Sequence, residues 1–180
     1  MHLTLRAPST AMDWMRIYRL YRRAFPRSER KPFQLIRKMH RKGCTDVWLA
    51  EQNGRFAGLA ATINAPDMIL VDYLAVHEKQ RSGGVGSAML HALLEQYAGR
   101  GLFVEIEAPD RDDPTGIKAR RKAFYLRNGL TEMHVLANLF GVRMELLGRD
   151  CCLDFDGYQA FYRDHYSAWA AEHISRPDDD

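Results

Sequence analysis

The chain has 180 residues, of which 46% are hydrophobic and 27% charged, and it carries a formal net charge of +3 at pH 7. This length and composition are ordinary for a soluble protein of one domain with a sizeable core. They exclude a membrane-spanning protein, because apolar runs such as residues 68–71 are far shorter than the roughly 20 residues that cross a bilayer.

Targeting signals and cysteine content predict a cytoplasmic protein. The N-terminal residues lack the basic and apolar regions of a secretory signal. The three cysteines, Cys44, Cys151 and Cys152, are an odd number with two adjacent, which argues against a disulfide framework and for a reducing compartment. The seven histidines show no metal-binding spacing, so no metal site is expected.

The N-terminal part of the chain predicts a short strand followed by two helices. Leu3 and Leu5 alternate with polar neighbours, as in a strand. Apolar residues recur at helical spacing over residues 11–25 and again between Pro32 and Gly43. Proline fits the first turn of a helix and glycine its end, so these two residues mark the expected limits of the second helix.

From residue 46 the hydrophobic period changes to two, which predicts strands. Residues 46–51 and 55–63 flank an Asn-Gly pair, a strong hairpin signal. Residues 68–76 form a third apolar segment, interrupted only by Asp72.

The second half of the chain alternates helices and strands. The expected elements are a helix over residues 85–96, a strand over 102–107, a helix over 116–127, strands over 131–139 and 142–147, and a helix over 155–172. This order predicts an α/β (α+β) fold whose mixed central sheet has helices on both faces. Residues 1–150 are the expected main domain, and residues 151–180 add a C-terminal helix and a frayed tail to it.

The last expected helix carries an aromatic stripe of Tyr158, Phe161, Tyr162, His165 and Trp169. Such a stripe is more often core packing than a ligand site. If it does not cover its own sheet, we expect it to pair with a second subunit, which would make the protein a homodimer.

The most informative segment links the strand at 68–76 to the following helix. Its sequence from Leu74 to Ser87 is LAVHEKQRSGGVGS, with three glycines in four positions. Glycines let the backbone approach a ligand closely, and the unpaired N–H groups and the dipole at a helix start attract phosphate. A phosphate or pyrophosphate site is therefore expected here.

We compared this segment with three phosphate-binding loop motifs, and the sequence does not match two of them. A Walker A loop needs Lys-Ser or Lys-Thr after its last glycine, where this chain has Ser87-Ala88. A dinucleotide fingerprint needs a third glycine where this chain has Met89. The pattern Arg-x-x-Gly-x-Gly matches residues 81–86, although a glycine-rich turn before a helix also arises by chance.

Together with the preceding Leu-Ala-Val, the loop resembles the pyrophosphate motif of the GNAT acyltransferase superfamily, LAVxxxxRxxGxG. The resemblance is good over residues 45–135 and elsewhere lies in the order of elements. It implies a GNAT-type, largely antiparallel sheet and acetyl-CoA as co-substrate. It also implies that the backbone of Leu74, Ala75 and Val76 holds the pantetheine arm, and that of Arg81, Ser82, Gly83, Gly84, Val85, Gly86 and Ser87 the pyrophosphate.

Basic residues dominate between residues 16 and 42, where Glu29 is the only acid. A solvated outer face of two helices would explain them, and so would a site for an anionic acceptor, for coenzyme phosphates or for nucleic acid. No nucleic-acid motif accompanies the cluster, which argues against nucleic acid.

Two glutamates lie in the otherwise apolar strand at 102–107. Glu105 and Glu107 are expected on the same face, because strand side chains alternate. A solvated strand end would explain them, and so would an active-site carboxylate, since an ammonium acceptor must lose a proton before it attacks a thioester. By the resemblance, Glu105 matches a position where some GNAT enzymes carry their general base. Asp72 is the alternative base, and Glu107 is the third choice.

Residues 124–130 read FYLRNGL and resemble the GNAT signature Tyr-x-x-x-Gly-Phe, with Leu130 in place of phenylalanine. The resemblance implies that Tyr125 protonates the departing thiolate, which suits a phenol of pKa ~10 facing a thiol of pKa ~8.5. Core packing is the alternative for a tyrosine at a helix end.

One region departs from the family pattern. Many members have an asparagine after the second strand that contacts pantetheine, whereas this chain has an acidic insertion, DRDDPTG. We expect basic side chains to contact the coenzyme here instead. The side chain of Lys118, Arg120, Arg121 or Lys122 would bind one of its phosphates.

The sequence therefore predicts an N-acetyltransferase that moves an acetyl group from acetyl-CoA to a primary amine of a small molecule or peptide by direct attack. By the resemblance, residues 25–30 and 136–143 border the acceptor site. One alternative is a non-catalytic acyl-CoA-binding regulatory module, against which Glu105 and Tyr125 together argue. The other is a macromolecule-directed acetyltransferase that uses the basic N-terminal helices.

Overall fold

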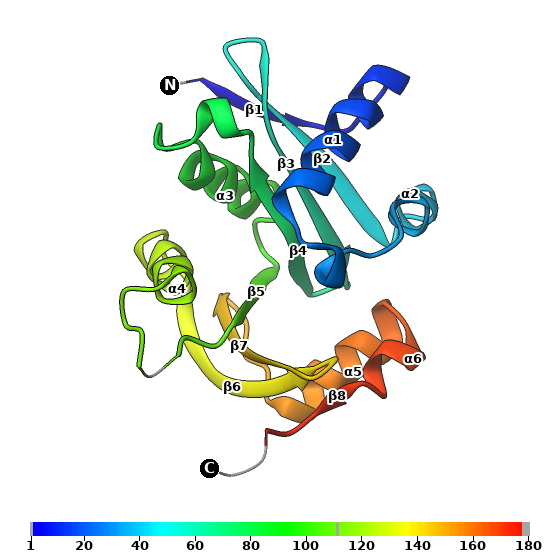
Figure 1. The fold of residues 1–180 in the computed structure, drawn as a ribbon. Coiled ribbons are helices and arrows are strands. Elements are labelled where there is room, and N and C mark those ends of the chain that lie inside the picture. Colours follow the sequence, from blue (N-terminus) through cyan, green and yellow to red (C-terminus); the bar gives the residue numbers. More distant parts are fainter. Residues whose placement is uncertain (1, 111, 178–180) are drawn as a thin grey trace. The chain divides into compact units, whose positions relative to one another are not determined.

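The computed structural model describes residues 2–110 and 112–177 (Figure 1). The elements of this part of the chain are, in order, β1 (Leu3–Arg6), α1 (Ala11–Ala24), the short 3₁₀ helix η1 (Arg27–Glu29), α2 (Phe33–Arg41), β2 (Thr45–Gln52), β3 (Arg55–Asn64), β4 (Met68–Val76), the 3₁₀ helix η2 (Glu78–Gln80), α3 (Val85–Gln96), β5 (Gly101–Glu107), α4 (Ile117–Arg127), β6 (Thr131–Leu139), β7 (Val142–Arg149), α5 (Phe155–His165), α6 (Ala168–Ala171) and β8 (Ile174–Ser175). None of the helices in the described residues is long and apolar enough to cross a membrane.

Within these residues the strands form one sheet with the order β1-β2-β3-β4-β5-β7-β6-β8. The pairs β1–β2, β2–β3, β5–β7, β6–β7 and β6–β8 are antiparallel. β4 and β5 pair in parallel, with Met68 opposite Gly101 and Leu70 opposite Phe103. The predicted fold class, a mixed and largely antiparallel sheet flanked by helices, is therefore confirmed.

The chain divides into two compact units, and β4 contributes to both. The first unit comprises the described residues of Met1–Asn64 and Val71–Gln96, and the second those of Ala65–Leu70 and Tyr97–Asp180. Each unit has its own core.

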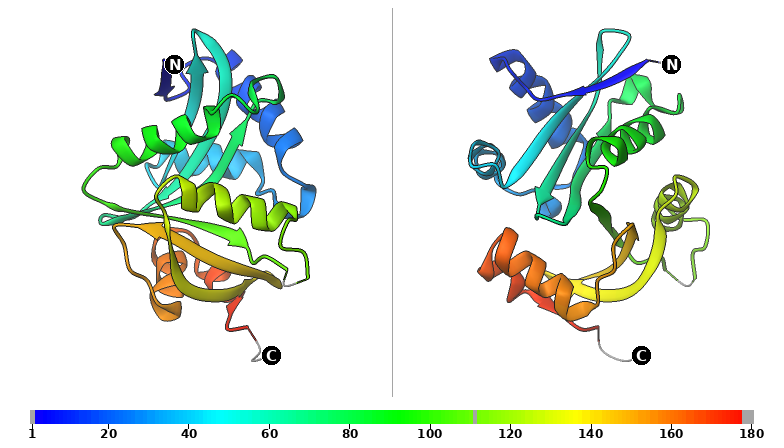
Figure 2. Two further views of the ribbon diagram at one scale, coloured as in Figure 1. Left: turned by 90° about the vertical axis from the view of Figure 1, so that its left-hand side faces the viewer. Right: turned by 180° about the vertical axis from the view of Figure 1, so that it is seen from behind.

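In the first unit, α1 and α2 lie on one face of the sheet and α3 on the other (Figures 1 and 2). Thr10 caps α1, because its side chain accepts a hydrogen bond from the Asp13 N–H and the Asp13 carboxylate accepts one from the Thr10 N–H. The core against α1 and α2 is made of buried apolar side chains from the helices and from alternate strand positions. They are Ile17, Leu20, Tyr21, Ile36, Val47, Leu49, Leu59, Ala61, Tyr73 and Ala75.

In the second unit, α4 lies on one face of the strands and α5 with α6 on the other (Figures 1 and 2). On the α5 side, the ring of Phe103 in β5 contacts that of Phe161 at a centroid distance of 5.0 Å. β6 curves strongly, and its pairing with β7 is irregular between Glu132 and Leu136, where His134 has a φ of 57°. A bulge of this kind bends a strand, and here it makes the sheet concave beneath α4.

The C-terminal region differs from the prediction of one helix over residues 155–172. The structure has two helices, because the chain leaves the first after His165 and Ser167 caps a second, accepting a hydrogen bond from the Ala170 N–H. Three residues of the aromatic stripe, Tyr158, Phe161 and Tyr162, are buried in the second unit, whereas Trp169 is 61% exposed. The acidic end at residues 178–180, predicted to fray, lies outside the described residues.

Candidate active site

The glycine loop connects β4 to α3. Ser82 and Gly84 have φ values of 65° and 74°, the left-handed conformation that favours glycine. The Ala88 N–H donates to the Gly84 carbonyl at 3.0 Å, which makes this the first intrahelical bond and Gly84 the N-cap. The N–H groups of residues 84–87 therefore have no partner in the helix.

This helix start is accessible to a ligand. Ser82, Gly83 and Gly84 are exposed. A Cβ atom added to Gly83 would meet only the Gln80 carbonyl, at 3.8 Å. Unpaired N–H groups at an exposed start of a helix of 12 residues attract anions through both hydrogen bonding and the helix dipole.

Asp72, the alternative base, is committed to an ion pair within the first unit. The Lys31 ammonium donates to both Asp72 carboxylate oxygens, at 2.8 and 2.7 Å. The two side chains are only 13% and 20% exposed, so the pair is largely shielded from water. The Lys31 ammonium thus occupies both oxygens of Asp72, and an acceptor could reach them only by displacing it.

The connection that carries Lys31 is itself fastened to β4. The Tyr73 hydroxyl donates to the Glu29 carbonyl at 2.9 Å and accepts from the Lys31 N–H at 3.2 Å. The Tyr21 hydroxyl donates to the Lys31 carbonyl at 3.0 Å. Burial raises the pKa of Tyr73 well above its usual value, so its hydroxyl stays protonated and keeps donating.

Glu105 is held by two tyrosines of α5. The hydroxyl of Tyr158 donates to its Oε1 at 2.8 Å and that of Tyr162 donates to its Oε2 at 3.0 Å. Both tyrosines are buried, at 0% and 2% exposure. The aromatic stripe is thus core packing, as expected, and in addition it positions a carboxylate.

Sequence reasoning missed this contact, although a signal existed. Tyr158 and Tyr162 lie four residues apart on one helix face, so two hydroxyls from that face can reach one acceptor. Glu105 was the polar residue in an apolar strand that needed such partners.

Glu107 contacts a different element from Glu105. Its carboxylate lies 3.4 Å from the Lys118 ammonium and 4.0 Å from an Arg121 nitrogen, both in α4. The pair of strand glutamates is therefore split between α5 and α4, and Glu107 is neutralised by basic residues.

Tyr125 lies in the last turn of α4 and is half-buried, with its ring 5.1 Å from that of Phe124. Burial raises the pKa of Tyr125 to about 12, while the charge of Arg121 opposes the shift. Among residues 2–110 and 112–177 its hydroxyl has no hydrogen-bond partner. Its hydroxyl is therefore protonated and makes no hydrogen bond to another described group.

The FYLRNGL segment ends α4 with a tight cap. The Tyr125 carbonyl accepts hydrogen bonds from the N–H groups of Asn128 and Leu130, at 3.1 and 3.2 Å. Gly129 between them has a φ of 89°, a conformation that side-chain-bearing residues rarely adopt. The glycine of the signature is thus a requirement of the helix end.

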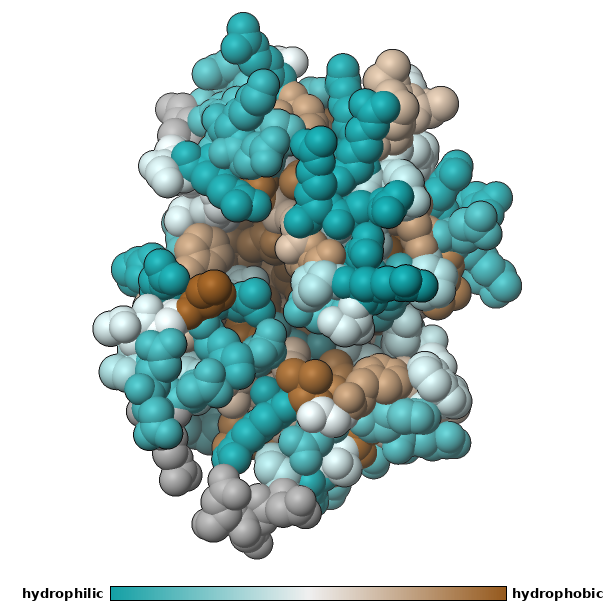
Figure 3. Space-filling model, in the orientation of Figure 1, coloured by the Kyte–Doolittle hydropathy of each residue, from teal (hydrophilic) through white to brown (hydrophobic). Residues whose placement is uncertain are grey.

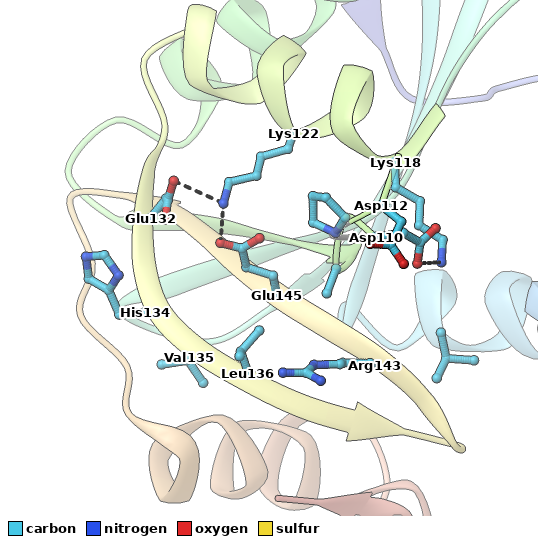
Figure 4. A pocket seen from close by; sticks show the side chains of 13 residues that line it. Asp110, Asp112, Lys118, Lys122, Glu132, His134, Val135, Leu136, Arg143 and Glu145 are labelled. Atoms are coloured by element: carbon cyan, nitrogen blue, oxygen red, sulfur yellow. Dashed lines mark hydrogen bonds and ion pairs between the residues drawn. The ribbon is translucent and has the colours of Figure 1, made fainter. Parts of the chain in front are cut away.

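The basic residues of α4 pair with acids of the second unit. Lys118 contacts Asp110 at 3.0 Å, and Lys122 bridges Glu145 at 2.7 Å and Glu132 at 3.0 Å (Figure 4). These side chains line a cavity of about 760 Å³ between α4 and the curved strands β6 and β7. With the contact between Arg121 and Glu107, three of the four cations expected to reach a coenzyme phosphate are thus engaged by carboxylates.

The mixed sheet, the glycine loop at α3 and the capped FYLRNGL segment together define an acetyltransferase of the GNAT type. The family model described as Acetyltransferase (GNAT) family matches residues 14–129. The chain therefore belongs to the GNAT family, and it is an acyltransferase. The resemblance seen in the sequence is confirmed.

Solved structures share the fold at low sequence identity. A Bacteroides thetaiotaomicron protein described as a GNAT-family acetyltransferase superposes with a TM-score of 0.76 at 18% identity, covering 92% of this chain and 99% of its own. The ribosomal-protein-S18-alanine N-acetyltransferase of Escherichia coli gives 0.63 at 19% identity, covering 84% and 96%. An aminoglycoside 6′-N-acetyltransferase complexed with coenzyme A gives 0.67 at 14% identity, covering 83% and 96%. No curated protein sequence matches the chain.

Proposed function

We propose that the protein transfers an acetyl group from acetyl-CoA to a primary amine of a small molecule or peptide by direct attack. The observation that carries the proposal is the exposed glycine loop, whose N–H groups at residues 84–87 suit a pyrophosphate. In this proposal the backbone of Leu74–Val76 holds the pantetheine arm. The names of two structural neighbours, which specify N-acetyl transfer, support an amine as acceptor.

The proposed reaction has a balanced proton inventory. The amine nitrogen attacks the thioester carbonyl, the new C–N bond forms, and the C–S bond breaks. The nitrogen loses two protons as the ammonium becomes an amide. We assign Glu105 as the group that takes the first, and Tyr125 as the group that protonates the departing thiolate; the second proton of the nitrogen restores the Tyr125 hydroxyl. Asp72 is the weaker candidate for the base because Lys31 already holds both of its oxygens.

The tyrosines on Glu105 are compatible with this role. The two hydroxyls donate to different oxygens of the carboxylate. They also fix the orientation of the carboxylate, since both rings are buried. A positioned base loses less freedom at the moment of proton transfer than a mobile one.

A thiol-release assay tests the proposal directly. Acetyl-CoA is incubated with the protein and a panel of primary amines, and free coenzyme A and acetylated amine are both quantified. We expect the two products in equal amounts with at least one amine. Hydrolysis of acetyl-CoA without acetylated amine would contradict direct transfer.

A further inference from the structure

A hollow in the first unit gathers basic and aromatic side chains at the junction of α1 and α2. Its volume is about 290 Å³. We refer to it as the arginine hollow, and it is lined by Tyr18, Tyr21, Arg22, Arg27, Arg30, Lys31, Pro32 and Phe33. Hydrophilic residues dominate the surface over α1 and α2 (Figure 3).

Three of its four cations lack a counter-charge. In the part of the chain that the structure describes, no carboxylate forms an ion pair with Arg22, Arg27 or Arg30, whereas Lys31 is paired with Asp72 at 2.7 Å. The cavity of the second unit is different, because its lysines are paired with carboxylates. The arginine hollow therefore has an excess of positive charge that an anion would balance.

The position of Arg30 is fixed by the fold, so its positive charge is a permanent part of the hollow. Its Nη1 donates to the Arg22 carbonyl at 3.4 Å, which holds the guanidinium at the end of α1. Its Nε is buried and has no hydrogen-bond partner among the described residues. A buried donor without a partner is unfavourable, so an acceptor oxygen at this position would stabilise the protein. A guanidinium presents parallel donors that match a carboxylate or a phosphate.

Aromatic rings form the walls beside these cations. Phe33 lies 5.0 Å from Tyr18 and 5.7 Å from Tyr21, measured between ring centroids. The Arg22 guanidinium lies 5.7 Å from the centre of the Tyr18 ring. The volume suits a small anionic group.

The hollow is tied to the strand that precedes the glycine loop. Lys31, in its wall, holds Asp72, and the Tyr73 hydroxyl holds the Glu29 carbonyl at 2.9 Å. Asp72 and Tyr73 come directly before Leu74–Val76, the stretch to which we assign the pantetheine arm. The hollow and the stretch assigned to the pantetheine arm are therefore linked through adjacent residues of β4.

We propose that the arginine hollow binds the phosphate or carboxylate group of the acceptor and so selects amines that carry a negative charge. This inference rests on the proposed acetyl transfer for the identity of the ligand as acceptor. It resolves the open meaning of the basic N-terminal helices in favour of an anionic acceptor.

Three primary amines that differ in their second group provide the kinetic test: O-phosphoethanolamine, β-alanine and ethanolamine. We expect kcat/KM for the better of the two anionic amines to exceed that for ethanolamine at least tenfold, and the better one identifies the preferred anion. Arg30→Gln should reduce this ratio at least tenfold. Arg41→Gln is the matched control, because it removes the same charge from an exposed position on α2 outside the hollow.

Binding is measured separately, by calorimetry with inorganic phosphate and with coenzyme A. Arg30→Gln should weaken phosphate binding at least tenfold, and Arg41→Gln should not. Arg27→Gln, at an exposed position of the hollow, should also weaken phosphate binding. Equal losses in Arg30→Gln and Arg41→Gln would overturn the inference in favour of diffuse surface charge. Weaker coenzyme A binding in Arg30→Gln, with unchanged amine selectivity, would overturn it in favour of the coenzyme phosphates. If phosphate binding depends on Arg30 but no amine is acetylated, the proposed acetyl transfer is wrong, whereas the arginine hollow is still an anion-binding site.

Discussion

The hydroxyl of Tyr125, which we propose as the acid, has the protonation state that this role requires. Because burial raises its pKa to about 12, it stays protonated at every pH at which the enzyme is assayed. Tyr125→Phe removes only this hydroxyl, which no described residue bonds, so stability and coenzyme affinity should change little. Turnover in the thiol-release assay should fall by roughly 10²–10⁴, the usual contribution of a positioned acid.

The raised pKa of Tyr125 determines how its contributions to stability and rate change with pH. Its folded pKa lies above the unfolded value of about 10, so its contribution to stability is complete below pH 10 and is lost as the pH rises toward 12. The rate should therefore show no decrease due to Tyr125 below about pH 10. A decrease near pH 8 that disappears in Tyr125→Phe would contradict its role as a protonated donor.

A second test decides whether Glu105 or Asp72 is the general base. Glu105→Gln keeps the shape of the side chain but cannot accept a proton, and its defect should shrink as the pH rises, because more acceptor arrives as free amine. Asp72→Asn should be milder in turnover, since the carboxylate it replaces is held by Lys31. Turnover is measured from pH 6 to 10 with one amine. If Asp72→Asn is the more damaging variant and the one rescued at high pH, the base is Asp72.

The sequence singled out Glu105 and Tyr125 as candidates, but it did not predict the side chains around them. Glu105 and Tyr125 stand out because a motif or an apolar strand marks them locally. The partners of Glu105 lie 53 and 57 residues away in the chain, a separation that local patterns do not encode. The alternation of strand side chains also failed to predict that Glu107 would be engaged by α4 instead.

At the level of secondary structure elements, α5 acts on β5 through its two tyrosines. Tyr158→Phe and Tyr162→Phe should each destabilise the protein by about 1–3 kcal/mol in urea unfolding, because each removes a hydrogen bond to a charged group. Each should also move the acid limb of the kcat/KM profile to higher pH, since a carboxylate with fewer donors holds its proton more tightly.

A double-mutant cycle provides the control for these tyrosines. In the Glu105→Gln background, Tyr158→Phe should leave the remaining pH dependence unchanged, because its effect acts through the carboxylate. A shift of the acid limb that persists in this background would show that the tyrosine acts on another group.

Element types were predictable wherever one hydrophobic period was sustained. The division of the expected 155–172 helix was not, because the apolar spacing continues across the break while Ser167 provides a new N-cap. β8 has only two residues, Ile174 and Ser175, and depends on pairing with β6 rather than on its own sequence pattern.

For the molecule as a whole, the sequence predicted the layers of the sheet but not the order of its strands. β7 lies between β5 and β6, an arrangement set by cross-strand packing and not by chain order. The homodimer stays a prediction. Since α5 covers strands of its own unit, we expect any contact to use the exposed Phe140, Val142 and Trp169.

Coenzyme binding should stabilise the whole fold, and the glycine loop offers a clean test. At 100 times its dissociation constant, a ligand that binds only the native state adds about 2.7 kcal/mol of stability. Gly83→Glu places a negative charge in the loop without a forbidden φ and with the nearest atom 3.8 Å from the new Cβ. Gly84→Glu is a poorer choice, because its φ of 74° strains any side chain.

We therefore expect Gly83→Glu to unfold in urea like the wild type when no ligand is present, and to gain no stability from acetyl-CoA. Gly83→Ala is the matched control, since it adds the Cβ without the charge and should keep most of the gain. The physical reason is that a carboxylate repels the pyrophosphate at the same N–H groups that would bind it. A full acetyl-CoA stabilisation in Gly83→Glu would place the coenzyme phosphates elsewhere and remove the basis for assigning Arg81 to Ser87 to them.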